Sequence, residues 1–455
     1  MSLLSFLNHA SYLIETKDTL LISDPYFEEP CFNRGWALLT NKLSNLEVVN
    51  YLKSQNKKLY IWISHEHSDH FSLPFLREIK KSEINYQILF HQTVDKRVLN
   101  FFIQNNFSAI ECKDGEIFKL SKELEILTWN NHDGSDSFCL TKLNDISILN
   151  INDCRVDTHN KAKSIRKKIL RHTENLDILF TQFGYANWIG IEEDQYLRQE
   201  AAEEKLYRIK IQHDVLKPSL VIPFASFVYF AKEENYYMND KQNGVSQVRS
   251  SEILREIQQN IVFMQPNQSV LLDKKEMFHK LKACTDIAES FWQDKKKRVD
   301  QKEKLIYESQ KKSPEEIKKV SRRYLRKINF QCFLAPFFFE LLRIKGMKSL
   351  KIFITDLNIS ISLSYLSGFR RINNLQLSNY DLIINSGEIF FLLKNDFGWN
   401  TLEVSGAFKL NKSIDIKKLD YFFKWQTLFK DGFSFKNPKK VLLVAIRFLE
   451  NSLFK

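Results

Sequence analysis

Apolar and polar positions alternate along the first part of the chain in a way that predicts strands and helices in turn. Apolar runs at residues 59–63 and 219–227 have the length and the β-branched or aromatic content of buried strands. Residues 72–81 and 195–216 instead favour amphipathic helices. This order of elements predicts an α/β fold, and we expect residues 1–270 to form a four-layer αβ/βα sandwich.

The pattern changes after residue 270. Residues 271–330 are charged and helix-forming, and Ser313-Pro314-Glu315-Glu316 is a typical helix start. From residue 331 the chain becomes rich in aromatic residues, with strands expected at 349–355, 359–366 and 380–385 and helices around 387–395 and 400–404. We therefore expect a helical connector at 271–330 and a smaller α+β C-terminal domain at 331–455.

The apolar run at residues 59–63 leads into His65-Glu66-His67-Ser68-Asp69-His70, although the chain has only 10 His in 455 residues. Strand residues two apart share a face, so His65 and His67 can reach one ion while Asp69 and His70 face a neighbouring position. Imidazole mixed with carboxylate suits zinc or iron better than magnesium or calcium. The motif predicts a site for one or two divalent metal ions.

Such a site has a predictable chemistry. A bound ion lowers the pKa of a coordinated water towards ~7, which supplies a metal-bound hydroxide at neutral pH. Asp69 can both bind the ion and orient that nucleophile. His9 is a second candidate for the cavity, as a hydrogen-bond donor to substrate or ligand, with a buried structural role as the alternative. An iron centre with the same ligands can bind dioxygen, and ligand types alone do not choose between zinc and iron.

The HxHxDH motif resembles the signature of the metallo-β-lactamase-fold superfamily. Residues 8–11 and 20–25 are similar to its opening hairpin, and a lone His132 and Asp153 each follow a later apolar run. The resemblance implies a catalytic domain over residues 1–270. It also implies two ligand groups: His65, His67 and His132 on one ion, and Asp69, His70 and Asp153 on the other.

The chain departs from the superfamily at the end of a later strand, where a last His usually completes the second ion. The run at residues 219–227 leads here into Lys232, Glu233 and Glu234. The second ion could use Glu233 or Glu234, water, or be absent. Lys232 is a candidate acid or base facing the cavity, because a nearby cation would lower its pKa, and a solvent-facing lysine is the alternative.

Residues 24–36, 182–188, 223–227 and 397–406 resemble the branch that contains the CMP-N-acetylneuraminate and UDP-N-acetylmuramate hydroxylases. This resemblance implies that Asn33, Asn187 and Trp188 lie near the substrate, with core packing as the alternative for Trp188. The C-terminal domain resembles the lipid-carrier-like α+β fold. Those hydroxylases carry a Rieske domain, but no His stands two residues after any of the six Cys here. Oxygenation would therefore need a separate electron-transfer protein.

Composition sets further limits. Scattered cysteines favour a reducing compartment, and we expect a cytoplasmic protein without a signal peptide or a membrane span of ~18 apolar residues. The net charge of +12 fits a small anionic substrate or an acidic redox partner. No nucleic-acid-binding signature is visible, so we do not expect that partner. The basic amphipathic segment at residues 437–449 packs on the C-terminal domain by default, with peripheral contact to an anionic membrane as the alternative.

Three functions remain open. The first is a metal-dependent hydrolase acting on an anionic ester, amide or phosphate, such as an N-acyl-sugar or nucleotide-sugar type substrate, because hydrolysis needs nothing outside this chain. The second is a di-iron oxygenase that acts on an amino sugar and needs an external electron donor. The third is a metal-stabilised binding protein without catalytic activity.

Overall fold

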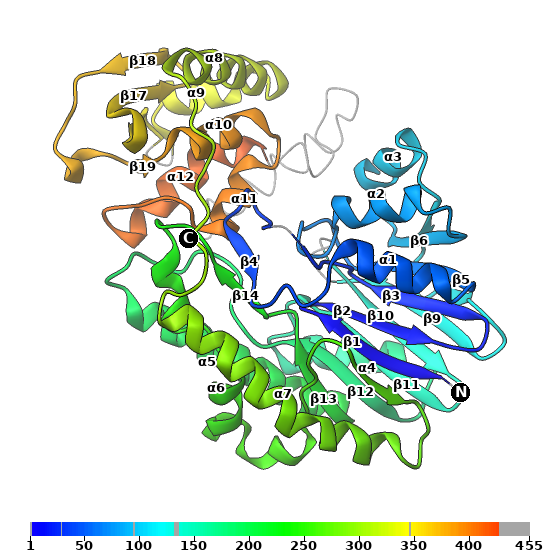
Figure 1. Cartoon of the computed structure of the whole chain (residues 1–455). Coiled ribbons are helices and arrows are strands. Elements are labelled where there is room, and N and C mark those ends of the chain that lie inside the picture. The colour runs from blue at the N-terminus through cyan, green and yellow to red at the C-terminus, as the bar shows by residue number, and fades with distance from the viewer. Residues whose placement is uncertain (1, 29, 94–95, 132–135, 345–346, 427–455) are drawn as a thin grey trace.

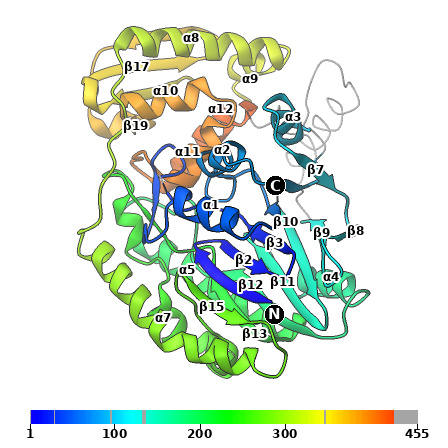
Figure 2. The same ribbon diagram turned by 45° about the vertical axis from the view of Figure 1, so that its right-hand side comes forward.

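The computed structural model of the chain describes residues 2–28, 30–93, 96–131, 136–344 and 347–426 (Figure 1). Two sheets face each other in its larger part, and a smaller α+β unit lies at one end (Figures 1 and 2). His132 and the segment at residues 437–449 lie outside the described residues.

The first sheet has the strand order β15-β1-β2-β3-β5-β6-β7. Its strands are β1 (Leu3–Asn8), β2 (Ser11–Glu15), β3 (Thr19–Ser23), β5 (Lys58–Ile63), β6 (Tyr86–His91), β7 (Ala109–Cys112) and β15 (Gln268–Leu271). Strands β3, β5, β6 and β7 run parallel. Helices α1 (Asn45–Ser54), α2 (Leu73–Lys81) and α3 (Arg97–Gln104) bury Leu52, Phe75 and Phe102 in one apolar cluster with Ile22 and Ile61 of this sheet.

The second sheet has the order β13-β12-β11-β10-β9-β8. Its strands are β8 (Ile117–Lys119), β9 (Leu124–Asn130), β10 (Ser137–Leu143), β11 (Ile146–Asn152), β12 (Leu176–Gln182) and β13 (Pro218–Phe224). Helices α4 (His159–Ile169), α5 (Gln195–Leu216) and α6 (Val245–Ser250) bury Ile165, Ile209 and Val248 in one apolar cluster with strands of this sheet. Tyr12 of the first sheet stacks on Phe180 of the second at 4.6 Å between ring centroids. The four-layer α/β sandwich is thereby confirmed.

The charged connector is divided between the two parts of the molecule. Helix α7 (Met277–Asp300) packs on the sandwich, where Trp292 stacks on Phe227 at 3.8 Å between ring centroids. Helix α8 (Pro314–Gln331) instead buries Tyr324 and Leu325 in the core of the smaller unit. The domain limits at residues 270 and 330 stay predictions.

The smaller unit has the sheet β18-β17-β16-β19 with helices on it. Its elements are α9 (Ala335–Leu341), β16 (Leu350–Ile354), β17 (Ile359–Ser364), β18 (Gly368–Ile372), β19 (Leu382–Ile384), α10 (Ser386–Lys394), α11 (Gly398–Ser405) and α12 (Ile416–Phe423). A two-stranded ribbon of β4 (Trp36–Leu38) and β14 (Val228–Phe230) faces it from the sandwich. Asn235 joins the two parts, because its Nδ2 donates to the carbonyls of Gly35 and Ser405.

Candidate metal centre

Turns at the ends of three strands build the site. His9 lies in the turn between β1 and β2, Asp24 follows β3, and Asn152 ends β11. All three have positive φ angles, of 43°, 38° and 46°, in a backbone region that non-glycine residues seldom adopt. Asn, Asp and His adopt this region more readily than other non-glycine residues, so these types suit the tight turns that end the strands.

The histidine-rich motif forms the loop between β5 and α2. This loop ends at Ser72, whose side chain accepts a hydrogen bond from Phe75 N and caps α2. Its start is held by Asp24, which accepts hydrogen bonds from the backbone and the hydroxyl of Ser64, both at 2.7 Å. Hydrogen bonds therefore fix the loop at both ends, at Ser64 after β5 and at the N-cap Ser72 of α2.

Asp24 also orients His70. Its Oδ2 lies 3.0 Å from His70 Nδ1, and Asn152 Nδ2 donates to the same oxygen. A ring nitrogen held by a carboxylate leaves the other nitrogen of the imidazole available as a ligand. The available atom here is His70 Nε2, which lies 3.3 Å from Asp69 Oδ2 and 3.5 Å from Asp153 Oδ2.

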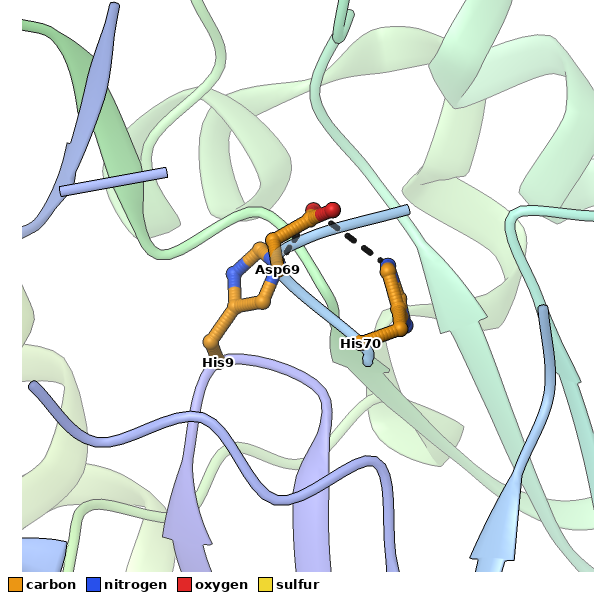
Figure 3. Close-up of side chains that lie close together, drawn as sticks. All are labelled: His9, Asp69 and His70. Atoms are coloured by element: carbon orange, nitrogen blue, oxygen red, sulfur yellow. Dashed lines mark hydrogen bonds and ion pairs between the residues drawn. The ribbon is translucent and has the colours of Figure 1, made fainter. Parts of the chain in front are cut away.

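Two groups of side chains around His70 are arranged so that each could hold a metal ion. The first consists of His9, Asp69 and His70, and in Figure 3 the Asp69 carboxylate lies between the two rings. His9 Nε2 is 3.2 Å from Asp69 Oδ2. The second consists of His65, His70 and Asp153, with His65 Nε2 4.0 Å from Asp153 Oδ2. His70 belongs to both groups.

The donor atoms fit a cation. Asp69 Oδ1 and His70 Nε2 are buried and have no hydrogen-bond partner among the described residues. Leaving a buried polar group unsatisfied costs about 1–3 kcal/mol, and a divalent ion between these atoms would remove that cost. Imidazole and carboxylate together suit zinc or iron. The prediction of a site able to hold one or two divalent ions is confirmed.

The electrostatics of the site also favour a cation. Burial and the nearby His70 lower the pKa of His65 to about 4, so its ring is neutral and able to bind metal. Burial would raise the pKa of Asp153, but attraction to His70 prevails and lowers it to about 2. Burial would lower the pKa of His70, yet the carboxylates of Asp69, Asp153 and Asp24 hold it well above its usual range. The carboxylates therefore create a negative potential at His70.

The two groups of side chains in the structure contain only part of each predicted ligand set. Asp69, His70 and Asp153 lie together, as the resemblance implied. His65 joins Asp153 and His70, and His67 lies beside it with Nδ1 2.9 Å from His65 Nε2 but belongs to neither group. The trio of His65, His67 and His132 stays a prediction, since His132 is outside the described residues.

The residues that follow β14, where the superfamily usually supplies a last His ligand, lie outside both ligand groups. Lys232 Nζ lies 2.5 Å from Glu388 Oε1 of α10, and Glu234 accepts a hydrogen bond from Asn385. Glu233 is exposed, and none of these three side chains belongs to either ligand group. The reason is non-local: α10 of the smaller unit docks against this segment. A catalytic role of Lys232 stays a prediction.

Of the three predicted substrate residues, Trp188 and Asn33 contact the smaller unit, and Asn187 is hydrogen-bonded to Trp188. Asn187 Nδ2 donates to the carbonyl of Trp188, whose own backbone N donates to Glu403 O at 2.9 Å. The Trp188 ring packs against Phe408 at 5.6 Å. Asn33 donates to Glu388 Oε2 at 2.8 Å and also lines a pocket.

This pocket lies next to the ligand groups and has a volume of about 550 Å³. The sandwich contributes Glu66, His67 and Arg97, and the smaller unit contributes Asn400 and Thr401. Its apolar lining comes from both parts and includes Phe71, Phe101, Phe391 and Phe397. Arg97 is paired with Glu66 at 3.1 Å. A substrate in the pocket would therefore contact both His67 and the smaller unit.

Sequence reasoning missed the groups that hold Asp153. Gln182 Nε2 donates to Asp153 Oδ1 at 3.1 Å, and Lys205 donates to Gln182 Oε1. Burial and the neighbouring Arg208 lower the pKa of Lys205 to about 7. The available signal was the position of Gln182 at the end of β12, parallel to β11, because parallel strands end at the same edge of a sheet.

Comparisons with known proteins agree with this architecture. No family model matches the chain. The cytidine monophosphate-N-acetylneuraminic acid hydroxylase of Mus musculus is 22% identical over 288 residues, which are 62% of this chain and 48% of that protein. The chain spans less than half the length of the first curated relatives that it matches.

Two solved structures are similar to about 60% of the chain. A mutant of the CmlA beta-hydroxylase has 15% identity and a TM-score of 0.40, over 60% of this chain and 54% of that chain. The metallo-beta-lactamase fold protein YhfI from Bacillus subtilis has 10% identity and a TM-score of 0.36, over 59% of this chain and 98% of that chain. The chain is similar to metallo-β-lactamase-fold proteins. The resemblance to the hydroxylase branch agrees with the curated relatives.

Proposed function

We propose that the chain is a metal-dependent hydrolase. The observation that carries the proposal is His70 Nε2, held between the carboxylates of Asp69 and Asp153 beside a pocket of about 550 Å³. When bound there, a divalent zinc or iron ion would lower the pKa of a coordinated water towards ~7 and polarise a substrate oxygen. Hydrolysis needs no group outside this chain.

Each neighbouring side chain has a role in this proposal. Asp24 holds His70 Nδ1 and thereby directs Nε2 into the site. With an ion bound, Asp69 would help to hold it and would orient the coordinated water, while His9 Nε2 steadies the same carboxylate at 3.2 Å. Gln182 keeps Asp153 in place. Lys232 stays a further candidate for an acid or base, and its Nζ is paired with Glu388 in this structure.

The pocket suggests the kind of substrate. Among the described residues that line it, Arg97 is the basic one and pairs with Glu66, while Glu28 adds a further acid. Aromatic rings from both parts of the molecule form much of the remaining lining. We therefore propose an ester or amide with an apolar acyl group in place of the anionic sugar expected from the net charge.

Turnover of chromogenic esters tests the proposal. Protein loaded with zinc should hydrolyse p-nitrophenyl hexanoate faster than p-nitrophenyl acetate, and His70→Ala should abolish both activities. Asp145→Ala is a matched control. Asp145 is an exposed acid in the turn between β10 and β11, at the opposite end of β11 from Asn152. Metal-loaded protein without any turnover of esters, amides or phosphodiesters would refute the hydrolase.

The second candidate is a di-iron oxygenase, favoured by the hydroxylase names of the curated relatives. It would require a separate electron-transfer protein, since the Rieske pattern is missing from this sequence. Ferrous protein prepared without air should then change its absorption spectrum on exposure to oxygen, and zinc protein should be inert. One tightly bound ion with neither activity would favour the third candidate, a metal-stabilised binding protein.

A further inference from the structure

Helix α8 carries a continuous basic face. Ile317, Tyr324 and Leu325 on one side are buried in the core of the smaller unit. The other side presents Lys318, Lys319, Arg322, Arg323, Arg326 and Lys327, whose spacing places them in a single stripe. Lys327 pairs with Asp396, and the other five are exposed. In Figures 1 and 2 the helix lies at the outer edge of the molecule, away from the sandwich.

Large apolar side chains follow the stripe directly. Phe330 lies four residues after Arg326 on the same side of α8 and is 73% exposed. Five more large apolar side chains in and around α9 have exposed fractions between 47% and 66%: Phe333, Leu334, Phe338, Leu341 and Leu342. Soluble proteins seldom expose so many large apolar side chains together unless the surface binds something.

The charge of the segment that forms this surface is almost all positive, while Glu315 and Asp396 lie at the edge of the stripe. From Lys318 to Arg343 the sequence contains a single acid, Glu340. That carboxylate is buried and accepts hydrogen bonds from Ser364 Oγ and Tyr365 N. The exposed charges between these two positions are therefore all positive, and the partner of this surface should be anionic.

The sequence at the end of the chain carries charge of the same sign. Trp425 packs edge-on against Phe339 at 5.2 Å, so the chain passes α9 just before residue 427. Residues 427–455 contain six Lys or Arg and two Asp or Glu, a net charge of +4. The segment has the same sign as the stripe, which argues against electrostatic pairing between them.

We propose that the α8–α9 surface, defined by the basic stripe and the six exposed apolar side chains, binds peripherally to an anionic lipid bilayer. Lys and Arg would contact phosphate headgroups while Phe330, Phe338 and Leu342 enter the boundary with the acyl chains. A membrane offers negative charge and apolar depth together, whereas an acidic protein matches only the charge. The binding is peripheral, because no described helix is long and apolar enough to span a bilayer.

Sedimentation of the full chain with lipid vesicles tests the proposal. We expect binding to phosphatidylcholine vesicles that contain phosphatidylglycerol and little binding to pure phosphatidylcholine. Arg322→Glu with Arg326→Glu should lower the partition coefficient by about tenfold or more. Lys119→Glu with Lys122→Glu is the matched control, because these exposed lysines at the β8 edge are not part of the surface.

A second variant separates lipid insertion from charge alone. Phe330→Ser should weaken binding most at high salt, where the electrostatic part is screened. Equal binding of wild type and the α8 variants, with normal thermal unfolding, would overturn the proposal. So would a loss of binding that occurs only in Lys439→Glu with Lys440→Glu, since it would assign the contact to the C-terminal segment. Binding to an acidic protein in place of vesicles would equally overturn it.

Discussion

His70 Nδ1 lies 3.0 Å from Oδ2 of Asp24, and this contact turns the other ring nitrogen towards Asp69 and Asp153. Asp24 is fully buried and receives further hydrogen bonds from Ser64 and Asn152. A residue that fixes the orientation of a ligand in this way is often as important as the ligand.

Asp24→Asn tests this relationship. The amide has only one acceptor oxygen, so it cannot serve Ser64, Asn152 and His70 together, and His70 should lose its fixed orientation. We expect metal affinity to fall by about 10- to 100-fold, measured by titration of metal-free protein with zinc. Asp145→Asn, an exposed acid, should leave affinity unchanged. Wild-type affinity in folded Asp24→Asn would show that His70 needs no such support.

Gln182→Leu tests the support of Asp153. Loss of the Gln182 Nε2 hydrogen bond frees the Asp153 carboxylate, which should reduce kcat about tenfold and leave KM nearly unchanged. The exposed Gln199→Leu on α5 is the control. A change in KM alone would indicate that Gln182 contacts substrate and does not position Asp153.

Phe397→Ala tests the pocket. Removing this ring should lower kcat/KM for p-nitrophenyl hexanoate by about fivefold, as expected for partial loss of one apolar contact of ~1 kcal/mol. Turnover of p-nitrophenyl acetate, whose acyl group offers little apolar surface to the ring, should change less. Phe338→Ala is a close match, because Phe338 is 48% exposed and Phe397 49%, yet Phe338 is outside the pocket. Equal losses of kcat/KM in both variants would show that the pocket does not bind the acyl group of the substrate.

The stability of the fold should depend on Glu403. Burial and the neighbouring Asp420 raise the pKa of Glu403 from 4.5 to about 7. A raised pKa contributes stability that is complete below about pH 4.5 and lost as pH rises through about 7. Glu403→Gln should therefore be more stable than wild type at pH 8, by about 2 kcal/mol, in urea unfolding. The exposed Glu200→Gln should not change the profile.

Local sequence patterns predicted much of the fold. The run before the motif is β5, residues 195–216 are α5, and Ser313 with Glu316 forms a capping box at α8. These features depend on neighbours a few residues away. Strand β18 was missed because it is an edge strand whose Arg370 and Arg371 face solvent, so its apolar alternation is weak.

The site was less accessible to sequence reasoning. The motif identified His65, Asp69 and His70, but residues 64–72 are not a strand, so spacing alone does not decide which metal-binding group each side chain joins. His9 reaches Asp69 across 60 positions. Lys232 pairs with Glu388 only because the smaller unit docks on the sandwich. Such contacts depend on tertiary packing, which periodicity does not encode.

The central claim is that His70 is shared by two metal-binding groups, and metal content tests it most directly. Zinc or iron bound per chain should be measured after dialysis for wild type and three variants. His9→Ala and His65→Ala should each weaken one group, whereas His70→Ala should empty both. Full metal content in His70→Ala, in a protein that unfolds at the wild-type temperature, would contradict the account.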